Sequence, residues 1–312
     1  MRFGTSYGGG SADAEAFIRQ AKEAERFGFS TFCLGDHIVF PLSPIVALHS
    51  ALMSTSTLRV ATSMLAQDLR HPAVLAKDIA TMDVFSGGRV ELGIGAGWMR
   101  DDYERTGIPM DSALVRIERL EEYAKVLRGL FGDEPVTFHG SHYQIDGLDG
   151  LPKPIQRPSP PIMMGGSGRK LLELAARTAD VVHIFPYEAI TQPRRGAAMV
   201  GERVDWIRDA AGDRIGDLEV ALSVNVLIVD DRAVGADKLL DHMAPRFKYF
   251  PTVADARSED LLSSPCYAIG SEEQVCEQLL SLREKYGVSY FMASSPDGPE
   301  GVAPIVARLN GE

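Results

Sequence analysis

The stretch of sequence that decides the fold runs from residue 59 to residue 97 and reads RVATSMLAQDLRHPAVLAKDIATMDVFSGGRVELGIGAG. It begins and ends with short apolar runs, which are typical of strands buried on both faces. Between them, Pro72 suits the first turn of a helix that extends to about Phe85 and is closed by Gly87 and Gly88. A strand, a helix and a second strand in this order predict a parallel βαβ unit.

The same alternation of strand and helix patterns continues to both ends of the chain. The predicted strands span residues 2–7, 31–35, 59–65, 89–94, 162–164, 181–185, 218–229 and 289–293. The predicted helices span residues 12–27, 44–53, 72–85, 114–130, 169–179, 194–211, 271–286 and 303–309. Ser11 is the expected N-cap of the first helix, and a capping box from Ser271 to Gln274 opens the seventh. Eight pairs of a strand and a helix favour an α/β fold with one closed (β/α)8 TIM barrel over a doubly wound sheet.

The length of the chain leaves room for two insertions in such a barrel. A barrel of this class needs about 250 residues in one domain, whereas the chain has 312. The remainder falls in residues 132–160, a hairpin pattern with a Pro-rich stretch, and in residues 236–266, two weak helical patterns with a polar loop. We therefore expect one domain over residues 1–312. It would carry a hairpin before the fifth strand and an irregular segment after the seventh, near the mouth of the cleft.

Composition and charge exclude several classes of protein. Hydrophobic residues make up 45% and charged residues 24%, which fits a globular chain. The net charge of −11 argues against nucleic-acid and anionic-membrane partners. No apolar run reaches the roughly 18 residues of a membrane helix, and no secretory signal is visible. The three cysteines form no CxxC motif, so we expect free thiols in a reducing cytoplasm.

Residues that could take part in catalysis or bind a ligand follow two of the predicted strands. The active site of a barrel lies at these strand ends. The second strand ends in Gly35-Asp36-His37, and a histidine can give or take a proton near neutral pH. The alternative is a polar pair that only starts a loop. The fifth strand runs into GGSGR at residues 165–169, where glycines and free N–H groups favour a phosphate. The alternative there is an ordinary turn with exposed basic residues.

Two further motifs are weaker. The GIGAG of residues 93–97 fails the dinucleotide fingerprint because its third glycine would fall at Trp98. We interpret these glycines as room for a flat ring, or else as a plain turn. His139 and His142 form an HxxH on the hairpin without other ligand residues nearby, so no metal site is predicted.

Taken together, these motifs resemble the bacterial luciferase-like oxidoreductases, and within them the branch that uses the deazaflavin coenzyme F420. The resemblance covers nearly the whole chain. The matching segments are GDH at 35–37, DLRHPAVLA at 68–76, LGIGAGW at 92–98, DYE at 102–104, GIP at 107–109, VTFHG at 136–140, HY at 142–143, PIMMGG at 161–166, AIGS at 268–271 and YGVSY at 286–290.

The resemblance implies a barrel that holds F420, or alternatively FMN, across its strand ends. It implies that Asp36 contacts the coenzyme, that His37 is the proton donor or acceptor beside the reacting carbon, and that Trp98 is a third catalytic group. It also implies a non-prolyl cis peptide between Ser63 and Met64, behind the ring. The residues expected to bind the coenzyme are Asp36, Ser63, Met64, Ala96, Gly97, Met163, Met164, Gly165, Gly166, Ser167, Gly168, Arg169 and Ile184.

The chain departs from the sugar-phosphate branch of that family at two places. Trp98 stands where that branch has a glutamate, and Phe185 follows the sixth strand where a lysine would hold a substrate phosphate. With Tyr187, these residues would make an aromatic mouth suited to a small-molecule substrate that is apolar or planar. Three hypotheses follow: an F420-dependent hydride-transfer enzyme, an FMN-dependent monooxygenase, or a binder without catalysis. The resemblance also implies a homodimer.

Overall fold

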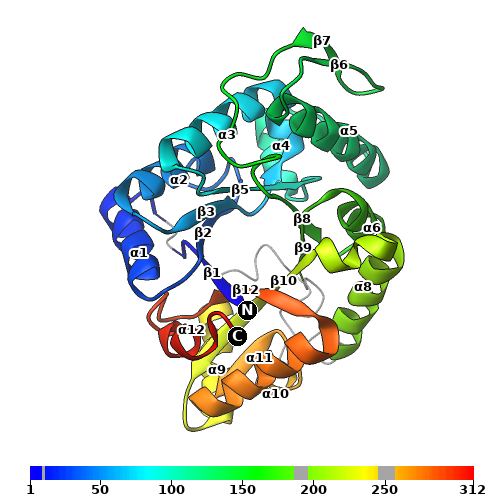
Figure 1. Ribbon diagram of the computed structural model, residues 1–312. Coiled ribbons are helices and arrows are strands. Elements are labelled where there is room, and N and C mark those ends of the chain that lie inside the picture. Colours follow the sequence, from blue (N-terminus) through cyan, green and yellow to red (C-terminus); the bar gives the residue numbers. More distant parts are fainter. Residues whose placement is uncertain (9–10, 186–195, 245–256) are drawn as a thin grey trace.

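The barrel predicted from the strand pattern is confirmed by a computed structural model, which describes residues 1–8, 11–185, 196–244 and 257–312. Eight strands close into a parallel barrel that helices surround (Figure 1). In order around the barrel they are β1 (Arg2–Ser6), β2 (Thr31–Leu34), β3 (Arg59–Thr62), β5 (Val90–Gly95), β8 (Ile162–Gly166), β9 (Val181–Ile184), β10 (Glu219–Ile228) and β12 (Val288–Ser294). The pairing of β12 with β1 closes the ring.

The helices of the outer layer also match the predicted pattern, with one addition. They are α1 (Ala14–Arg26), α2 (Pro44–Ser54), α3 (Pro72–Ser86), α5 (Ala113–Phe131), α6 (Arg169–Thr178), α8 (Gly196–Ala211), α11 (Glu272–Tyr286) and α12 (Ala303–Leu309). The sequence reading missed α4 (Arg100–Thr106), which is too short to show a periodic apolar face. The start predicted for α8, at Arg194, lies outside the described residues.

The prediction of Ser11 as the N-cap of α1 is wrong. The helix begins at Ala14, and its N-cap is Asp13, whose carboxylate accepts a hydrogen bond from the N–H of Ala16 at 3.0 Å. Both residue types are good N-caps, so local sequence preference did not separate them. The capping box between Ser271 and Gln274 is confirmed at the start of α11.

The irregular segment predicted after the seventh barrel strand, residues 236–266, contains two helices, as its two weak helical patterns indicate. They are α9 (Arg232–Met243), which begins shortly before it, and α10 (Ser258–Leu262). A further strand, β11 (Tyr267–Gly270), follows directly after the segment. The strand β11 pairs with residues 225–228 of β10, whereas β9 pairs with residues 219–222. Because β12 pairs with one side of β10, both β9 and β11 pair with its other side, β9 near the start of β10 and β11 near its end. The sheet therefore extends further toward the strand ends at β10 than at β9.

The predicted hairpin before the fifth barrel strand is confirmed as β6 (Val136–His139) and β7 (Gln144–Leu148). It lies outside the ring of helices, beside α5 (Figure 1). The Glu122 carboxylate of α5 accepts hydrogen bonds from the backbone N–H groups of Ser141, His142 and Tyr143 in its turn. Burial raises the pKa of Glu122, but these three donors outweigh it and hold that pKa below its usual range.

Two apolar cores follow from the alternation of side chains along each strand. One fills the space between strands and helices, and the other lies inside the barrel. The inner core consists of Cys33, Ala61, Met163, Val181, Ala221, Tyr290 and Met292, with Met64 packed against it.

Charged side chains close the end of the barrel where the strands begin. Glu91 of β5 is 2% exposed and binds Arg2 of β1 at 2.5 Å and Arg59 of β3 at 2.8 Å. Arg2 also binds Glu219 of β10 at 2.5 Å. This network ties four strands together at the end opposite the expected site.

Candidate active site at the strand ends

The end of β3 carries the cis peptide that the family resemblance implied. The bond between Ser63 and Met64 is cis, and the chain then forms β4 (Leu65–Ala66) and the short 3-10 helix η1 (Gln67–Leu69). The side chains of Ser63 and Met64 are partly exposed. This bulge therefore lines the open end of the barrel.

The glycines of β5 and β8 make room for this bulge. A Cβ added at Gly93 would overlap the carbonyl oxygen of Thr62 and lie 2.8 Å from the Met64 sulfur. One added at Gly95 would lie 3.2 Å from the Cβ of Met64, and one at Gly165 would lie 3.0 Å from its methyl group. The interpretation of the GIGAG glycines as room for a flat ring is thus corrected, because Met64 fills that space.

His37 lies at the end of β2 and is fixed by a carboxylate from α4. Its Nδ1 is 2.7 Å from an oxygen of Asp102, and the other Asp102 oxygen accepts the N–H of Val39 at 3.3 Å. Asp102 is buried, whereas 14% of the His37 side chain is exposed. Because a carboxylate only accepts hydrogen bonds, Nδ1 carries a proton, and Nε2 is left to exchange one.

Asp102 is a candidate site residue that the sequence analysis did not include. The triplet that contains it, DYE at 102–104, served only as a family motif. Asp102 is 65 positions from His37, and no spacing rule relates them. A helix N-terminal aspartate next to a glycine-rich strand end is common, so the pair becomes visible only in the folded barrel.

Two aromatic rings stand edge-on to His37. The ring of Phe40 is 4.7 Å away between centroids and that of Trp98 is 5.4 Å away. Phe40 is 41% exposed and Trp98 is 46% exposed. Phe185, after β9, is also exposed, whereas Tyr187 lies outside the described residues. The histidine is therefore bordered by apolar surface.

Asp36, which the resemblance places at the coenzyme, has both carboxylate oxygens engaged by the protein. Arg70 binds them at 2.5 and 3.1 Å, and the N–H of Ala66 donates to one of them at 3.1 Å. Asp36 is 3% exposed. The structure thus gives it a supporting position, in which it ties the end of β2 to the segment that follows the cis peptide.

A second buried carboxylate supports the same region from behind. One oxygen of Asp68 accepts the hydroxyl of Tyr103 at 2.9 Å, and the other accepts Arg119 at 2.5 Å. Burial, and then the nearby Asp68 charge, raises the pKa of Tyr103. Tyr103 therefore stays protonated and remains a donor to Asp68.

Ala96 and Gly97 form the turn after β5, and Arg116 of α5 binds it. The guanidinium donates to the carbonyl of Ala96 at 3.0 Å and to that of Gly97 at 3.3 Å. Gly97 has a φ of +76°, and a Cβ there would overlap the Tyr103 hydroxyl. Glycine is therefore required at this position by the fold itself.

Three side chains expected at the coenzyme lie in the cores instead. Met163, Met164 and Ile184 are fully buried. Met163 belongs to the core inside the barrel, whereas Met164 and Ile184 belong to the core beneath the helices. Side chains alternate across a strand, so adjacent positions cannot both face the barrel axis.

The turn between β8 and α6 is exposed, and an arginine of α8 binds its backbone. Ser167 is partly exposed and Gly168 exposed, and α6 begins without a side-chain cap. Arg203 of α8, 3% exposed, donates to the carbonyl of Ser167 at 3.1 Å. Arg169 is exposed and binds Glu173 at 2.7 Å. Backbone N–H groups, rather than buried methionines, are what this strand end offers a ligand.

Comparison with known proteins places the chain in a family. A family model described as luciferase-like monooxygenase matches residues 1–290. The chain belongs to the luciferase-like monooxygenase family. This finding confirms the resemblance that the motifs indicated.

A curated relative matches this luciferase-like chain over part of its length. It is an FMNH(2)-dependent dimethylsulfone monooxygenase of Pseudomonas putida, 32% identical over 176 residues. The alignment covers 54% of this chain and 48% of that protein. The chain therefore spans about half the length of the curated relative.

Solved structures share the fold over nearly the whole chain. A monooxygenase from Streptomyces bottropensis has a TM-score of 0.80 at 22% identity, with 99% of each chain covered. A coenzyme F420-dependent tetrahydromethanopterin reductase from Methanopyrus kandleri also has a TM-score of 0.80, at 19% identity, with 98% of this chain and 97% of that chain covered. At these identities, the likeness shows the luciferase-like barrel alone.

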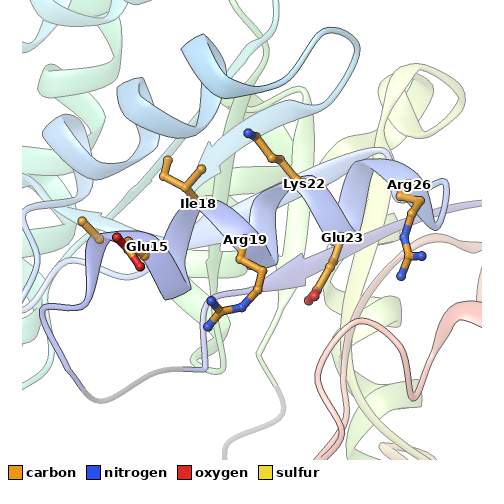
Figure 2. Close-up of a pocket in the computed structure, with 7 residues that line it drawn as sticks. Glu15, Ile18, Arg19, Lys22, Glu23 and Arg26 are labelled. Carbon is orange, nitrogen blue, oxygen red and sulfur yellow. The ribbon is translucent and has the colours of Figure 1, made fainter.

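A surface hollow of about 570 Å³ on this luciferase-like protein is formed by α1 and lies on the helix ring. Both acidic and basic side chains lie along it (Figure 2), which is typical of a solvated helix face. In the described part of the chain, no group of three metal-ligating side chains comes together. None of the described helices has the length and apolar character to cross a bilayer.

Proposed function

We propose that this protein is an oxidoreductase that binds coenzyme F420 across the strand ends and moves a hydride between the coenzyme and an uncharged, apolar or planar organic substrate. The observation that carries the proposal is His37, held through Nδ1 by the buried Asp102 at 2.7 Å beside the cis Ser63–Met64 bulge. When bound, the deazaflavin supplies a carbon that accepts or donates a hydride.

The residues present fit a flat ring with a phosphate tail. The partly exposed bulge at Ser63–Met64 offers a back wall, and Asp36 with Arg70 holds that wall in place. The turn at 165–168 offers backbone N–H groups at an uncapped helix start, which suits a phosphate. A Cβ added at Gly168 would meet nothing within 4 Å, so space is open there.

The proposed task of His37 is to move a proton through Nε2. Asp102 fixes the imidazole so that Nε2 stays in one orientation. Phe40 and Trp98 border the ring and exclude water from that side. We therefore propose that Trp98 shapes the pocket and that Asp36 and Asp102 position other groups.

A second candidate is an FMN-dependent monooxygenase. The observation that favours it is the 32% identity to an FMNH(2)-dependent enzyme. The F420 proposal is supported by the motifs, which resemble the F420 branch. A barrel that binds either coenzyme without catalysis is the third candidate. The buried Asp102 behind the partly exposed His37 argues against it, because binding alone needs no oriented proton carrier.

Titration of the purified protein with F420 and, separately, with FMN decides between the candidates. We expect F420 fluorescence to be quenched with a dissociation constant in the micromolar range or below, and FMN to bind more weakly. Tight FMN binding without F420 binding would replace the first candidate with the second. Binding without any turnover over a panel of ketones and enones would favour the third.

The phosphate part of the proposal has its own test. Gly168→Val should weaken coenzyme binding about tenfold by crowding the helix start, since only the ligand would meet the new side chain. Gly216→Val is the matched control, because a Cβ at Gly216 also meets nothing within 4 Å and lies in the 3-10 helix η3 (Gly212–Asp217). Equal affinities of the two variants would move the phosphate elsewhere.

We further propose that the protein is a cytoplasmic homodimer. Large apolar side chains are exposed on the neighbouring helices α2 and α3, among them Met53 and Phe85, and such patches favour association. The cysteines are all buried and free, which suits a reducing compartment. Light scattering should give twice the 33.9 kDa mass of the chain, and a monomer mass would contradict the dimer.

A further inference from the structure

One wall of the barrel mouth carries uncharged polar side chains. They lie near the ends of β9, β10 and β12. On each strand, the polar residues stand two or four positions after a residue whose side chain faces the barrel interior, namely Val181, Ala221 or Met292. Because side chains alternate along a strand, the polar side chains also face the barrel axis. The four side chains are His183, Ser223, Asn225 and Ser294.

Hydrogen bonds within this polar wall leave the amide N–H groups of Asn225 and the buried Nδ1 of His183 without a partner among the described residues. His183 Nε2 is 2.8 Å from the Ser223 hydroxyl. Ser294 and Asn225 are register partners, and the Ser294 hydroxyl donates to Asn225 Oδ1 at 3.0 Å. No described residue bonds to Asn225 Nδ2, and the side chain is partly exposed. The amide therefore presents N–H donors and has its acceptor already engaged.

The polar wall carries no charge. Beyond Glu219, the strands β9, β10 and β12 contain no acidic, lysine or arginine residue. Complete burial lowers the pKa of His183 to about 4, so that its imidazole is neutral at physiological pH. The arginines behind the opposite wall, Arg70 and Arg119, bind buried carboxylates. Nothing on these strands would stabilise an anionic substrate.

The polar wall faces the proposed coenzyme wall across the barrel. Going round the barrel in either direction, β10 is four strands from β3, whose end carries the cis bulge. Likewise β9 is four strands from β2, whose end carries His37. The extra strand β11 supports the outer half of β10, from Asn225 onward. A ligand between the two walls would have the bulge on one side and Asn225 on the other.

We propose that Asn225 is a specificity-determining residue that donates a hydrogen bond to an oxygen of an uncharged substrate of the carbonyl class. Ser294 fixes the orientation of the amide, and the apolar rings of Phe40 and Trp98 take the rest of the molecule. This inference rests on the proposed function for the position of the coenzyme. It assigns a neutral, oxygen-bearing substrate in place of a carboxylate or phosphate.

The test compares two aromatic probes of similar size on the full chain, with and without saturating coenzyme. Acetophenone has a neutral carbonyl, and benzoate has a carboxylate. Ligand-observed NMR titration should show acetophenone binding at least about fivefold more tightly than benzoate, the scale of one neutral hydrogen bond without a charge partner. Equal or tighter binding of benzoate, or no saturable binding of acetophenone, would overturn the proposal.

Variants locate the effect. Asn225→Asp removes the donors and should weaken acetophenone binding about fivefold or more. Asn310→Asp is the matched control, since Asn310 is exposed and its amide donates to the backbone carbonyl of Gly28, outside the polar wall. Ser294→Ala, a milder change, should weaken binding about twofold because the amide loses its fixed orientation. Unchanged affinity in both wall variants, at unchanged melting temperature, would sink the assignment.

Failure of this inference is distinguishable from failure of the proposed function. Coenzyme titration of the same variants should give the wild-type dissociation constant, because the polar wall lies opposite the bulge. If the wild-type protein binds the coenzyme but shows no preference for acetophenone over benzoate, the role of Asn225 alone is rejected. Retained preference in a protein that binds neither coenzyme would reject the proposed function and leave the role of the wall standing.

Discussion

At the scale of single residues, the proposed chemistry of this barrel rests on one histidine and the carboxylate that holds it. His37 comes from the end of β2 and Asp102 from the first turn of α4. The imidazole is partly exposed and the carboxylate is buried. A partly exposed proton carrier with a buried orienting partner suits acid–base catalysis.

The first prediction concerns this pair. His37→Ala should lower the single-turnover rate of the coenzyme-loaded protein at least about 100-fold, the scale of a lost acid or base. Coenzyme affinity should stay within about twofold, because the bulge and the glycine turn are untouched. Stopped-flow absorbance of the coenzyme measures the rate. An unchanged rate would contradict the role of His37.

The positioning role of Asp102 is tested with its neighbour. Asp102→Asn should slow the same step roughly tenfold or more, because the imidazole loses its negative partner, and Asp102→Glu should recover part of the rate. Asp101→Asn is the matched control, since the Asp101 side chain is 45% exposed and pairs with Arg105 on the same helix. Equal effects of the Asp101 and Asp102 variants would reject the role.

The second prediction concerns pH and His183. Burial lowers its folded pKa to about 4, from an ordinary value of 6.5. Between these values, the unfolded chain binds the proton and the folded chain does not. The free energy of unfolding should therefore rise with pH across this window, by at most about 1.4 kcal/mol per pH unit from this residue.

The pH effect is measured by urea unfolding at several pH values. His183→Gln should remove this part of the slope between pH 4 and 6.5, whatever its effect on overall stability. The exposed His139 provides the control variant His139→Gln, which should keep the slope. The same slope in wild type and His183→Gln would contradict the assignment.

At the scale of elements, two helix starts show when local sequence is sufficient to predict the N-cap residue and when it is not. Ser271 and Gln274 form a reciprocal cap that no nearby residue can replace, so the sequence alone predicted it. At α1, Ser11 and Asp13 are both acceptable caps. In the folded chain it is Asp13 whose side chain accepts the hydrogen bond from the N–H of Ala16.

The third prediction follows from that choice. Asp13→Ala should lower the free energy of unfolding by about 1 kcal/mol, because the N–H of Ala16 loses its partner. Ser11→Ala should leave it unchanged within about 0.3 kcal/mol, as expected of a surface substitution. Equilibrium urea unfolding measures both. A larger loss in the Ser11 variant would restore the sequence-based assignment.

Strand alternation separates neighbouring residues of the predicted site. Met163 and Met164 are both expected to bind the coenzyme, yet their two side chains enter different cores. The inward direction at each strand follows from the barrel register, which β8 shares with β5 and β9. The strand β11 was missed because four apolar residues before a capping box give too short a pattern.

At the scale of the whole molecule, the two ends of the barrel have separate roles. The strand starts are tied by Glu91 to Arg2 and Arg59, and the strand ends carry the bulge, the histidine and the polar wall. The same division between a stabilising and a reactive end is common in this fold. Stability and activity should therefore respond to different substitutions.

The fourth prediction tests that division. Glu91→Gln should destabilise the protein by about 3 kcal/mol, because two arginines lose a buried partner. Glu219→Gln should have a smaller effect, below about 1 kcal/mol, because Glu219 is 27% exposed. Urea unfolding gives both values. Coenzyme affinity of either folded variant should equal that of wild type, and a changed affinity would contradict the separation of the two ends.

The sequence by itself determined the order of strands and helices, the number of strands in the barrel, the hairpin, and the family motifs. These depend on periodicity and turn chemistry, which act over a few residues. Only the tertiary structure decided that Asp102 meets His37, that Met64 fills the space over three glycines, and that Asn225 faces the bulge. Such contacts join residues far apart in the chain, and they exist only once barrel closure and register have set which side chains point inward.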